Sequence, residues 1–313
     1  MSGLFVVEPG PQTTVQDLGR PGYLRYGIPP SGPMDREAFC LANRLVGNPE
    51  SAAGLECTVQ GPRLEIRQES VVAVTGAEMP FRINGQPAPL WQAVLVRPGD
   101  LLQLGMVKTG CRAYLAAAGG IDVPLVLGSR ATYLRGRLGG VEGRALQKGD
   151  LLPVGRPTEA LDAVEGRRVR PDLIPAYPQE VECRVILGPQ DDRFTPEGIE
   201  AFLTGPYQVT PQVDRMGYRL KGPGITYRHG HDIVSDGIPL GGIQVPGGQP
   251  IVLLVDRQST GGYTKIATVI SPDIARIGQT KPGHWIRFRR VGLAEAHALL
   301  RAEARRWEDA ILR

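Results

Sequence analysis

The chain has 313 residues, of which 42% are hydrophobic and 22% are charged, and its formal net charge is +4. This is enough apolar material for packed cores, which excludes general disorder. The arginines are scattered or interleaved with acids, so the charge pattern argues against a nucleic-acid partner. The length exceeds the usual size of one compact core and predicts two domains.

The cysteines and the N-terminus indicate a cellular compartment. Cys40, Cys57, Cys111 and Cys183 lie far apart with no CxxC pair, which is typical of buried thiols in a reducing environment. The N-terminal sequence MSGLFVVEPGPQTT lacks a basic region, and nowhere do about 18 apolar residues run together. We therefore expect a cytoplasmic protein without a membrane partner.

Short apolar runs bounded by Gly, Pro or Asp recur along the chain, among them RLEIRQ, SVVAVTG, CRAYLAAAGG, CRVILGP, QPIVLLVD and HWIRFRR. The 41 glycines and 28 prolines make roughly a fifth of the chain, against about an eighth on average, and they predict many tight turns. The fold class predicted is therefore mainly β, with barrels or sandwiches and few helices.

Four segments carry helical signals. Residues 35–46 have apolar residues at helical spacing and stop at Gly47, Asn48 and Pro49. Thr195 is placed to cap a helix that has Pro196 at its first position and ends at Gly205, and Ser271 with Pro272 repeats that start. Residues 293–312 predict a C-terminal helix whose buried face comprises Leu293, Ala296, Leu300, Trp307 and Ile311.

An internal repeat organises the chain. TTVQDLGRPGYLRYGI, LECTVQGPRLEIRQESVVAVTGAE and RPGDLLQLG in the first half correspond in order and spacing to TPQVDRMGYRLKGPGI, LGGIQVPGGQPIVLLVDRQSTGG and KPGHWIRFR in the second. The stretch from Arg156 to Pro178 has little periodicity. We predict two copies of one β-barrel-like unit, residues 1–165 and 176–313, each presenting equivalent loops.

The strongest candidate for chemistry is the polar loop, residues 256–265, with the sequence DRQSTGGYTK. It follows the apolar run PIVLLV, so Asp256 lies where a central strand leaves the core. Gly261 and Gly262 permit positive φ and exposed amides that could bind a carboxylate, a phosphate or an oxyanion. The corresponding segment of the first repeat, TGAEMPFRING, has few such groups. A tight hairpin with a solvated ion pair is the alternative.

Two corresponding motifs are further candidates. The segment 16–35 pairs Asp17 with Arg20 across Gly19 and places Ser31 before a helix, where it could bind a carboxylate. Its counterpart QVDRMGYRL holds Asp214, Arg215 and Arg219. An ordinary helix cap at Ser31 or Asp35, and a buried Asp–Arg pair that fixes a turn, are the alternatives.

Other segments give weaker signals. GSRATYLRGRLGGVEGRALQKGD places four arginines between glycines, an arrangement that suits a carboxylate, a phosphate or a partner protein. His229 and His231 form an HxH pair without further ligand candidates, so we expect no metal site. The chain has no Walker A motif, no GxSxG elbow and no biotin-attachment AMKM sequence.

Five ordered segments together resemble one family: TTVQDLGRPGYLRYGIPPSGPMD, GSRATYLRGRLGGVEGRALQKGD, DRMGYRLKGP, GGIQVPGGQPIVLLVDRQSTGGYTKIATVI and KPGHWIRF. They are similar to the KipA family, also known as the C subunit of 5-oxoprolinase and formerly as the second subunit of allophanate hydrolase. This family is related to subdomains A and B of the urea amidolyase carboxyltransferase. The resemblance implies two cyclophilin-like β-barrel domains with a few short helices and a C-terminal helix.

The resemblance also implies a function. The family opens 5-oxoproline (pyroglutamate) to L-glutamate with ATP hydrolysis, through phosphorylation of the lactam, together with two partner subunits, one KipI-like and one LamB/YcsF-like. ATP, with magnesium and shared with the partners, would be bound, and no biotin would be attached. In the urea amidolyase branch the polar loop reads more like DGPSLGGF, without Arg257, Gln258 and Lys265, so this chain resembles the KipA branch more closely.

Roles follow as hypotheses. Lys265 and Arg257 would stabilise an anionic phosphate or carboxylate, and Asp256 would orient them or bind a metal. Substrate contacts are expected from the loop, the GGIQVPGG segment and the two corresponding motifs, namely Gln258, Thr260, Gly261, Gly262, Tyr263, Gln244, Asp17, Arg20, Ser31, Asp214, Arg215 and Arg219. Two other functions stay open: binding a KipI-type kinase inhibitor, and biotin-dependent carboxyl transfer to urea or a similar amide.

Overall fold

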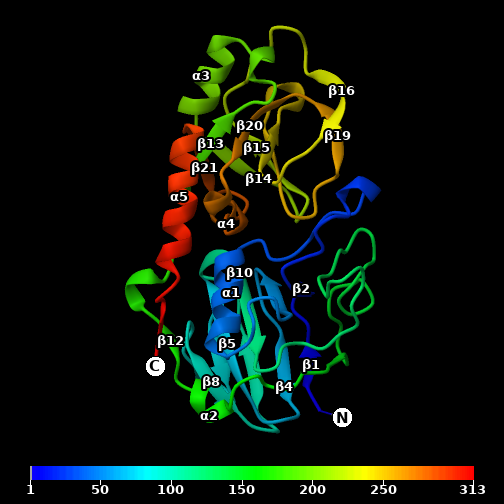
Figure 1. Ribbon diagram of the computed structural model, residues 1–313, viewed down its shortest axis with the longest axis vertical. Helices are drawn as coiled ribbons and strands as arrows, with labels where there is room; N and C mark the ends of the chain where they lie inside the picture. Colours follow the sequence, from blue (N-terminus) through cyan, green and yellow to red (C-terminus); the bar gives the residue numbers. More distant parts are fainter. Residues whose placement is uncertain (1) are drawn as a thin grey trace. The chain divides into compact units, whose positions relative to one another are not determined.

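The structure, a computed structural model, describes residues 2–313 and divides into two compact units. The first unit comprises the chain up to Arg20, residues 31–177 and residues 309–313. The second comprises residues 21–30 and 178–308. The predicted mainly β fold class is confirmed, because strands form both units (Figure 1).

The first unit contains two antiparallel sheets around one core. A six-stranded sheet has the order β11-β1-β4-β9-β6-β7, formed by β1 (Leu4–Glu8), β4 (Arg63–Ile66), β6 (Phe81–Ile83), β7 (Gln86–Pro87), β9 (Leu101–Leu104) and β11 (Leu151–Leu152). A five-stranded sheet has the order β2-β3-β10-β5-β8, formed by β2 (Gln12–Gln16), β3 (Gly54–Thr58), β5 (Ser70–Glu78), β8 (Ala93–Val96) and β10 (Thr109–Ala117). One apolar cluster includes residues of both sheets, so their inner faces pack on each other.

Helix α1 (Arg36–Leu45) covers the outer face of the five-stranded sheet, in front of β5 and β10 in Figure 1. Because β5 is covered on both sides, its sequence SVVAVTGAE is almost continuously apolar. Phe39 meets Tyr114 of β10 edge to face, with ring centroids 5.9 Å apart. The Asp35 side chain caps the helix by accepting from the Ala38 amide at 3.0 Å. The helix predicted at residues 35–46 is confirmed.

The remaining elements of the first unit are short. They are α2 (Leu161–Val164), the 3₁₀ turn η2 (Pro171–Leu173), and a two-stranded sheet of β12 (Arg168–Val169) and β22 (Ile311–Leu312). All four cysteines in the chain are free and buried, as the sequence predicts. Burial raises the pKa of Cys40 and of Cys57 to about 12, so neither thiol ionises near neutral pH.

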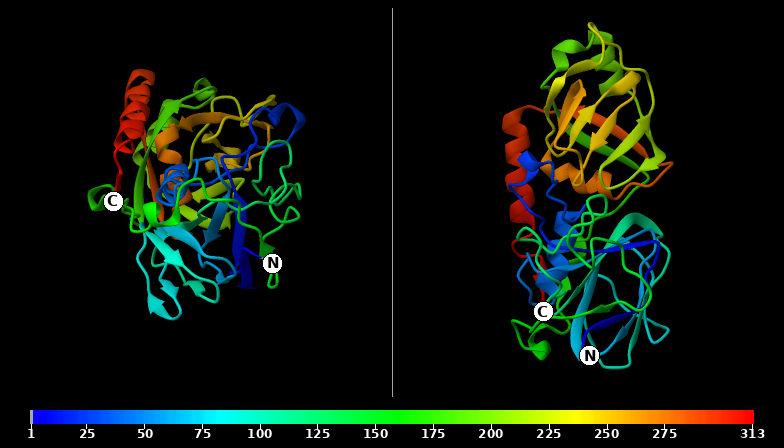
Figure 2. Two further views of the ribbon diagram at one scale, coloured as in Figure 1. Left: turned by 60° about the horizontal axis from the view of Figure 1, so that its bottom comes forward. Right: turned by 90° about the vertical axis from the view of Figure 1, so that its right-hand side faces the viewer.

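The second unit is built on a closed barrel, visible in the right-hand view of Figure 2. Its strand order is β13-β20-β17-β18-β15-β14-β21. These strands are β13 (Glu180–Leu187), β14 (Tyr207–Val213), β15 (Gly217–Lys221), β17 (Gly242–Gln244), β18 (Ile251–Leu253), β20 (Lys265–Val269) and β21 (Trp285–Arg290). Strands β13 and β21 pair in parallel and close the barrel, whereas its other strand pairs are antiparallel.

Helices and a separate pair of strands complete this unit. The helices are α3 (Pro196–Thr204), α4 (Ile274–Gly278) and α5 (Leu293–Arg306), and the 3₁₀ turns are η1 (Leu24–Tyr26), η3 (Asp191–Arg193), η4 (Pro246–Gly248) and η5 (Ser271–Asp273). Strands β16 (Asp232–Gly237) and β19 (Thr260–Tyr263) pair only with each other among the residues described, and we call them the ribbon. None of the helices between residues 2 and 313 is long and apolar enough to cross a membrane.

The C-terminal helix differs from its prediction. It ends at Arg306, because residues 311–312 pair with β12 and the Arg170 amide donates to the Ala310 carbonyl at 2.8 Å. Leu293 and Leu300 were expected to be buried, but 60% and 47% of their surfaces are exposed. Ala296 and Trp307 are buried as predicted, and Ala296 packs with Ile270 and Val291, joined by the partly buried Leu299.

The predicted start of α3 is confirmed and can be tested. Thr195 Oγ1 accepts from the Gly198 amide at 3.0 Å, and Pro196 occupies the first turn. Replacing Thr195 by Ala should lower the free energy of unfolding by about 1 kcal/mol, because an amide of the first turn loses its acceptor. Urea unfolding followed by circular dichroism measures this change. Thr204→Ala, at the other end of the same helix, should change it by less than about 0.5 kcal/mol, and equal losses would contradict the capping role.

Candidate active site

A buried ion pair joins two of the predicted motifs in the second unit. Arg215 lies in the turn between β14 and β15, and Asp256 lies just beyond β18. Arg215 Nε donates to Asp256 Oδ2 at 2.9 Å and Nη2 donates to Oδ1 at 3.3 Å. Only 4% of the Arg215 side chain and 5% of the Asp256 side chain are exposed. Because the Asp256 amide also donates to the Arg215 carbonyl at 2.9 Å, the two segments are fixed to each other.

The neighbours of Arg215 in sequence have other roles. Asp214 Oδ1 accepts from the amides of Met216 at 2.7 Å and Gly217 at 3.1 Å, so it stabilises the turn. The Arg219 side chain is exposed on β15. The alternative to substrate binding for this motif was a buried Asp–Arg pair that fixes a turn. Such a pair exists, but its carboxylate is Asp256 of the polar loop.

Arg257 faces the backbone of its own unit. Its Nε donates to the Ile238 carbonyl at 2.9 Å, and Nη1 donates to the Leu254 carbonyl at 3.3 Å. Burial lowers its pKa, since a buried guanidinium loses hydration. These hydrogen bonds attach the polar loop to the neighbouring backbone. Gln258 is half-buried and Thr260 is exposed beside it.

Lys265 opens β20 and is almost completely buried. Only 1% of its side chain is exposed, whereas 55% of the Asp236 side chain is. Its Nζ donates to Asp236 Oδ2 at 3.1 Å. The pKa of the Asp236 carboxyl is below its ordinary value, mainly because of the hydrogen bond from Lys265. A buried ammonium thus meets a carboxylate that reaches it from the surface.

Gln190 holds the Lys265 backbone on both sides. The side-chain Oε1 of Gln190 accepts from the Lys265 backbone amide at 3.0 Å, and the backbone amide of Gln190 donates to the Lys265 carbonyl at 3.1 Å. Gln190 Nε2 also lies 3.5 Å from Asp236 Oδ2. Sequence reasoning missed both Gln190 and Asp236. The position of Gln190 directly after a strand and a Gly–Pro turn was a usable signal, but Asp236 lies in an unremarkable polar segment.

The glycines of the polar loop lie in a strand. Gly261 and Gly262 are part of the extended strand β19 and are not among the described residues with positive φ, so the positive φ that they permit is not used here. Gly261 does permit a close approach, because a methyl group added there would lie 2.6 Å from Gln244 Nε2. Tyr263 is 41% exposed, and its ring centroid lies 5.9 Å from that of His231.

The two charged ends of the polar loop do not form one cluster. Lys265 is paired with Gln244, the last residue of β17. Asp256 lies three residues after Leu253, and the Leu253 carbonyl accepts from the amide of Gly241, the residue just before β17. Asp256 and Lys265 therefore lie towards opposite ends of that short strand and have different partners. The hypothesis that Asp256 orients Lys265 has no hydrogen bond between them to support it.

The candidate residues of the first unit bind a neighbouring loop. Asp17 accepts from the amide of Gly19 at 2.8 Å, from Ser129 Oγ at 2.6 Å and from the amide of Arg130 at 2.5 Å. Arg20 is 1% exposed and donates to the carbonyl of Ala131. Asp17 and Arg20 thus fix the segment that begins the arginine-rich stretch.

Ser31 has an unusual conformation. Its φ is +58°, it is 5% exposed, and its hydroxyl has no hydrogen-bond partner among residues 2–313. Left-handed backbone in a non-glycine residue and an unpaired buried hydroxyl each cost of order 1–3 kcal/mol. Asp35, not Ser31, is the helix cap, so the alternative structural role falls to Asp35.

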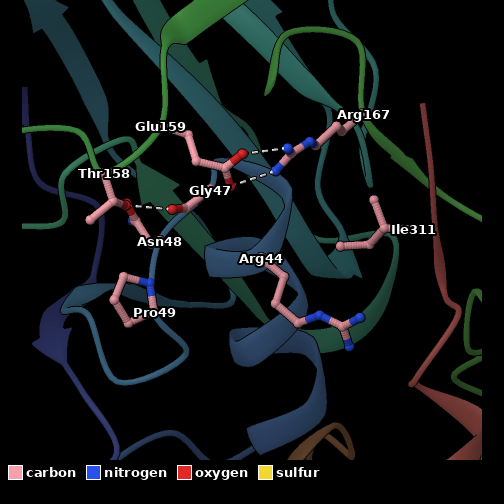
Figure 3. A pocket seen from close by; sticks show the side chains of 8 residues that line it. All are labelled: Arg44, Gly47, Asn48, Pro49, Thr158, Glu159, Arg167 and Ile311. Carbon is pink, nitrogen blue, oxygen red and sulfur yellow. Dashed lines mark hydrogen bonds and ion pairs between the residues drawn. The ribbon is translucent and has the colours of Figure 1, made fainter. Parts of the chain in front are cut away.

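A cavity of about 520 Å³ in the first unit is shown in Figure 3. Its walls are tied to one another, because Arg167 binds Glu159 at 3.0 and 2.6 Å and Thr158 Oγ1 donates to the Gly47 carbonyl at 2.6 Å. These bonds connect the end of α1 to the segment before β12. The charges of Glu159 and Arg167 neutralise each other, so this pair favours a structural role for the cavity wall.

The structure contains no group of three or more His, Cys, Asp or Glu side chains suited to a metal ion between residues 2 and 313. His229 is exposed. His231 Nδ1 lies 2.9 Å from Asp232 Oδ1. The HxH pair is thus a surface feature of the segment that leads into β16.

The fold and the site define a mainly β protein whose closed barrel carries a buried lysine, and comparisons identify its family. Residues 26–290 match the family "Carboxyltransferase domain, subdomain A and B". The chain is 38% identical over 294 residues to the 5-oxoprolinase C subunit of Escherichia coli, covering 94% of this chain and 93% of that protein. It is also 38% identical over 305 residues to the urea amidolyase of Lachancea kluyveri, covering 90% of this chain.

Solved structures agree with these matches. The crystal structure of the K. lactis urea amidolyase has a TM-score of 0.92 and 33% identity, over 99% of this chain and 21% of that chain. The chain spans 16% of the length of the L. kluyveri urea amidolyase. The chain belongs to the carboxyltransferase subdomain A and B family, and its relatives include the 5-oxoprolinase C subunits of two bacteria.

The Arg215–Asp256 pair gives a stability prediction. Arg215→Met leaves the buried Asp256 carboxylate without this cation, and Asp256→Asn leaves the buried Arg215 guanidinium without this anion. Either change alone should lower the free energy of unfolding by about 3–5 kcal/mol. The double variant should lose clearly less than the sum of the two. Urea unfolding of all four proteins measures the coupling. The exposed pair Arg287–Glu180, at 2.5 Å in the same barrel, is the control and should couple by less than about 1 kcal/mol; equal coupling in both pairs would contradict the role of burial.

Proposed function

We propose that this chain is the C subunit of an ATP-dependent 5-oxoprolinase, which opens 5-oxoproline to L-glutamate together with a KipI-like and a LamB/YcsF-like partner. The match to the E. coli protein carries this proposal, because it extends over 93% of that protein. The urea amidolyase match has the same identity, but most of that protein has no counterpart in these 313 residues.

The second unit offers chemistry that suits this reaction. Opening a lactam with ATP creates negative charge on carboxyl, carbonyl and phosphoryl oxygens. Lys265 holds an ammonium group away from water, where it stabilises such charge more strongly than a solvated lysine does. ATP, with Mg²⁺, would supply the phosphoryl group and would be shared with the partner subunits.

The remaining candidates divide into two roles. Lys265 and Gln244 lie against the ribbon and Tyr263 belongs to it, and we propose that these three residues contact substrate. Arg215, Asp256 and Arg257 hold the polar loop on the barrel through buried bonds, and we propose that they position it.

Biotin-dependent carboxyl transfer is the second candidate, favoured by the TM-score of 0.92 to a urea amidolyase. It predicts carboxylation of urea or a similar amide when a carboxylated biotin carrier is supplied. A KipI-binding regulator would bind its partner without turnover. The three functions therefore differ in what they consume.

The test is reconstitution with the two partner subunits, measuring ATP hydrolysis that depends on 5-oxoproline. Lys265→Met should reduce turnover at least about tenfold while the complex still assembles, because the oxyanion loses its buried cation. Lys221→Met removes an exposed lysine of the same barrel and should leave turnover unchanged. Carboxylation of an amide with no 5-oxoproline-dependent hydrolysis would refute the proposed function, and full activity of Lys265→Met would refute the role of Lys265.

A further inference from the structure

The ribbon covers two buried polar side chains of the barrel. Gln244 of β17 and Lys265 of β20 are directly paired across an antiparallel ladder, so their side chains are on the same face. Gln244 and Lys265 are 2% and 1% exposed. The Gly261 backbone of β19 lies against Gln244, and Asp236 of β16 binds Lys265. Both strands of the ribbon therefore take part in the cover.

The ribbon is weakly built. A two-stranded sheet alone is marginally stable in water, and β16 and β19 pair with no barrel strand among the described residues. Val234 at the middle of β16 is 92% exposed, so its apolar side chain adds nothing to the packing. Figure 1 places both strands at the margin of the second unit. The ribbon can therefore separate from the barrel at lower cost than any barrel strand.

The backbone of Lys265 is bound by a residue outside the ribbon. Its amide and carbonyl are bound by Gln190, which lies outside the ribbon at the end of β13. Among residues 2–313, Asp236 is the one acceptor that its ammonium group has, and an ammonium can donate three hydrogen bonds. The buried cation is thus fixed to the barrel, whereas its counter-ion belongs to the marginal ribbon.

We infer that Lys265 forms an oxyanion subsite beneath the ribbon, and that Asp236 is a built-in occupant which the carboxylate or phosphate group of a ligand replaces. An unpaired ammonium group is costly to bury, so the chain supplies an anion when no ligand is bound. The side-chain amide of Gln244, on the same face, can bind a neighbouring carbonyl or amide of the ligand. The subsite therefore suits a small carboxylate that also carries an amide. The inference rests on the proposed function only in calling that ligand a substrate.

The experiment measures how fast an amine-reactive acetylating reagent modifies Lys265 in the whole isolated chain, with Lys221 as the exposed reference in the same molecule. Asp236→Asn should raise the rate at Lys265 roughly fivefold or more, because the uncharged ribbon no longer holds the ammonium. Asp232→Asn, which removes the other aspartate of the ribbon, should leave the rate within about twofold. Asp236→Ser should reproduce the effect of Asp236→Asn with a smaller side chain.

Ligands distinguish the sources of the anion. In Asp236→Asn, 5-oxoproline or inorganic phosphate should slow the modification of Lys265, whereas 2-pyrrolidinone, which lacks the carboxylate, should not. Protection by one anion and not the other identifies the group that the subsite binds. An unchanged rate in both Asp236 variants, no protection by either anion, or failure of both variants to fold would overturn the inference. Because no partner and no ATP is used, this outcome is independent of the turnover assay.

Discussion

A buried ammonium must have a negative partner, and this requirement organises the candidate site. Lys265 is 1% exposed, and its partner Asp236 is half in solvent on a separate pair of strands. Gln190 fixes the lysine backbone through two hydrogen bonds. The position of the cation is therefore fixed by the barrel, whereas the anion that it binds can change.

The rest of the polar loop supports this arrangement by rigid means. Asp256 and Arg257 are buried and bind Arg215 and backbone carbonyls, so the start of the loop is anchored where β18 ends. The loop then crosses as β19 and returns to the barrel at Lys265. The polar loop is one motif in the sequence, but its first residues attach it to the barrel and its last residue, Lys265, belongs to the candidate site.

Local patterns in the sequence were sufficient for much of the fold. Apolar runs marked the strands, and the Thr195–Pro196 start marked α3, because each signal depends on neighbouring residues alone. The choice of partners was not predictable in this way. Arg215 pairs with a carboxylate 41 residues away rather than with adjacent Asp214, and Asp236 is exposed and polar in a segment without a motif. Leu293 and Leu300 fit the same helical stripe as Ala296, yet of these three only Ala296 is buried.

The central claim is that Lys265 receives the anionic group of a substrate, and a structure of the protein with 5-oxoproline bound tests it most directly. The account predicts a ligand oxygen within about 2.7–3.2 Å of Lys265 Nζ, with Asp236 displaced from it and Gln190 still bound to the Lys265 backbone. A ligand bound elsewhere, with the Lys265–Asp236 pair intact, would contradict the account.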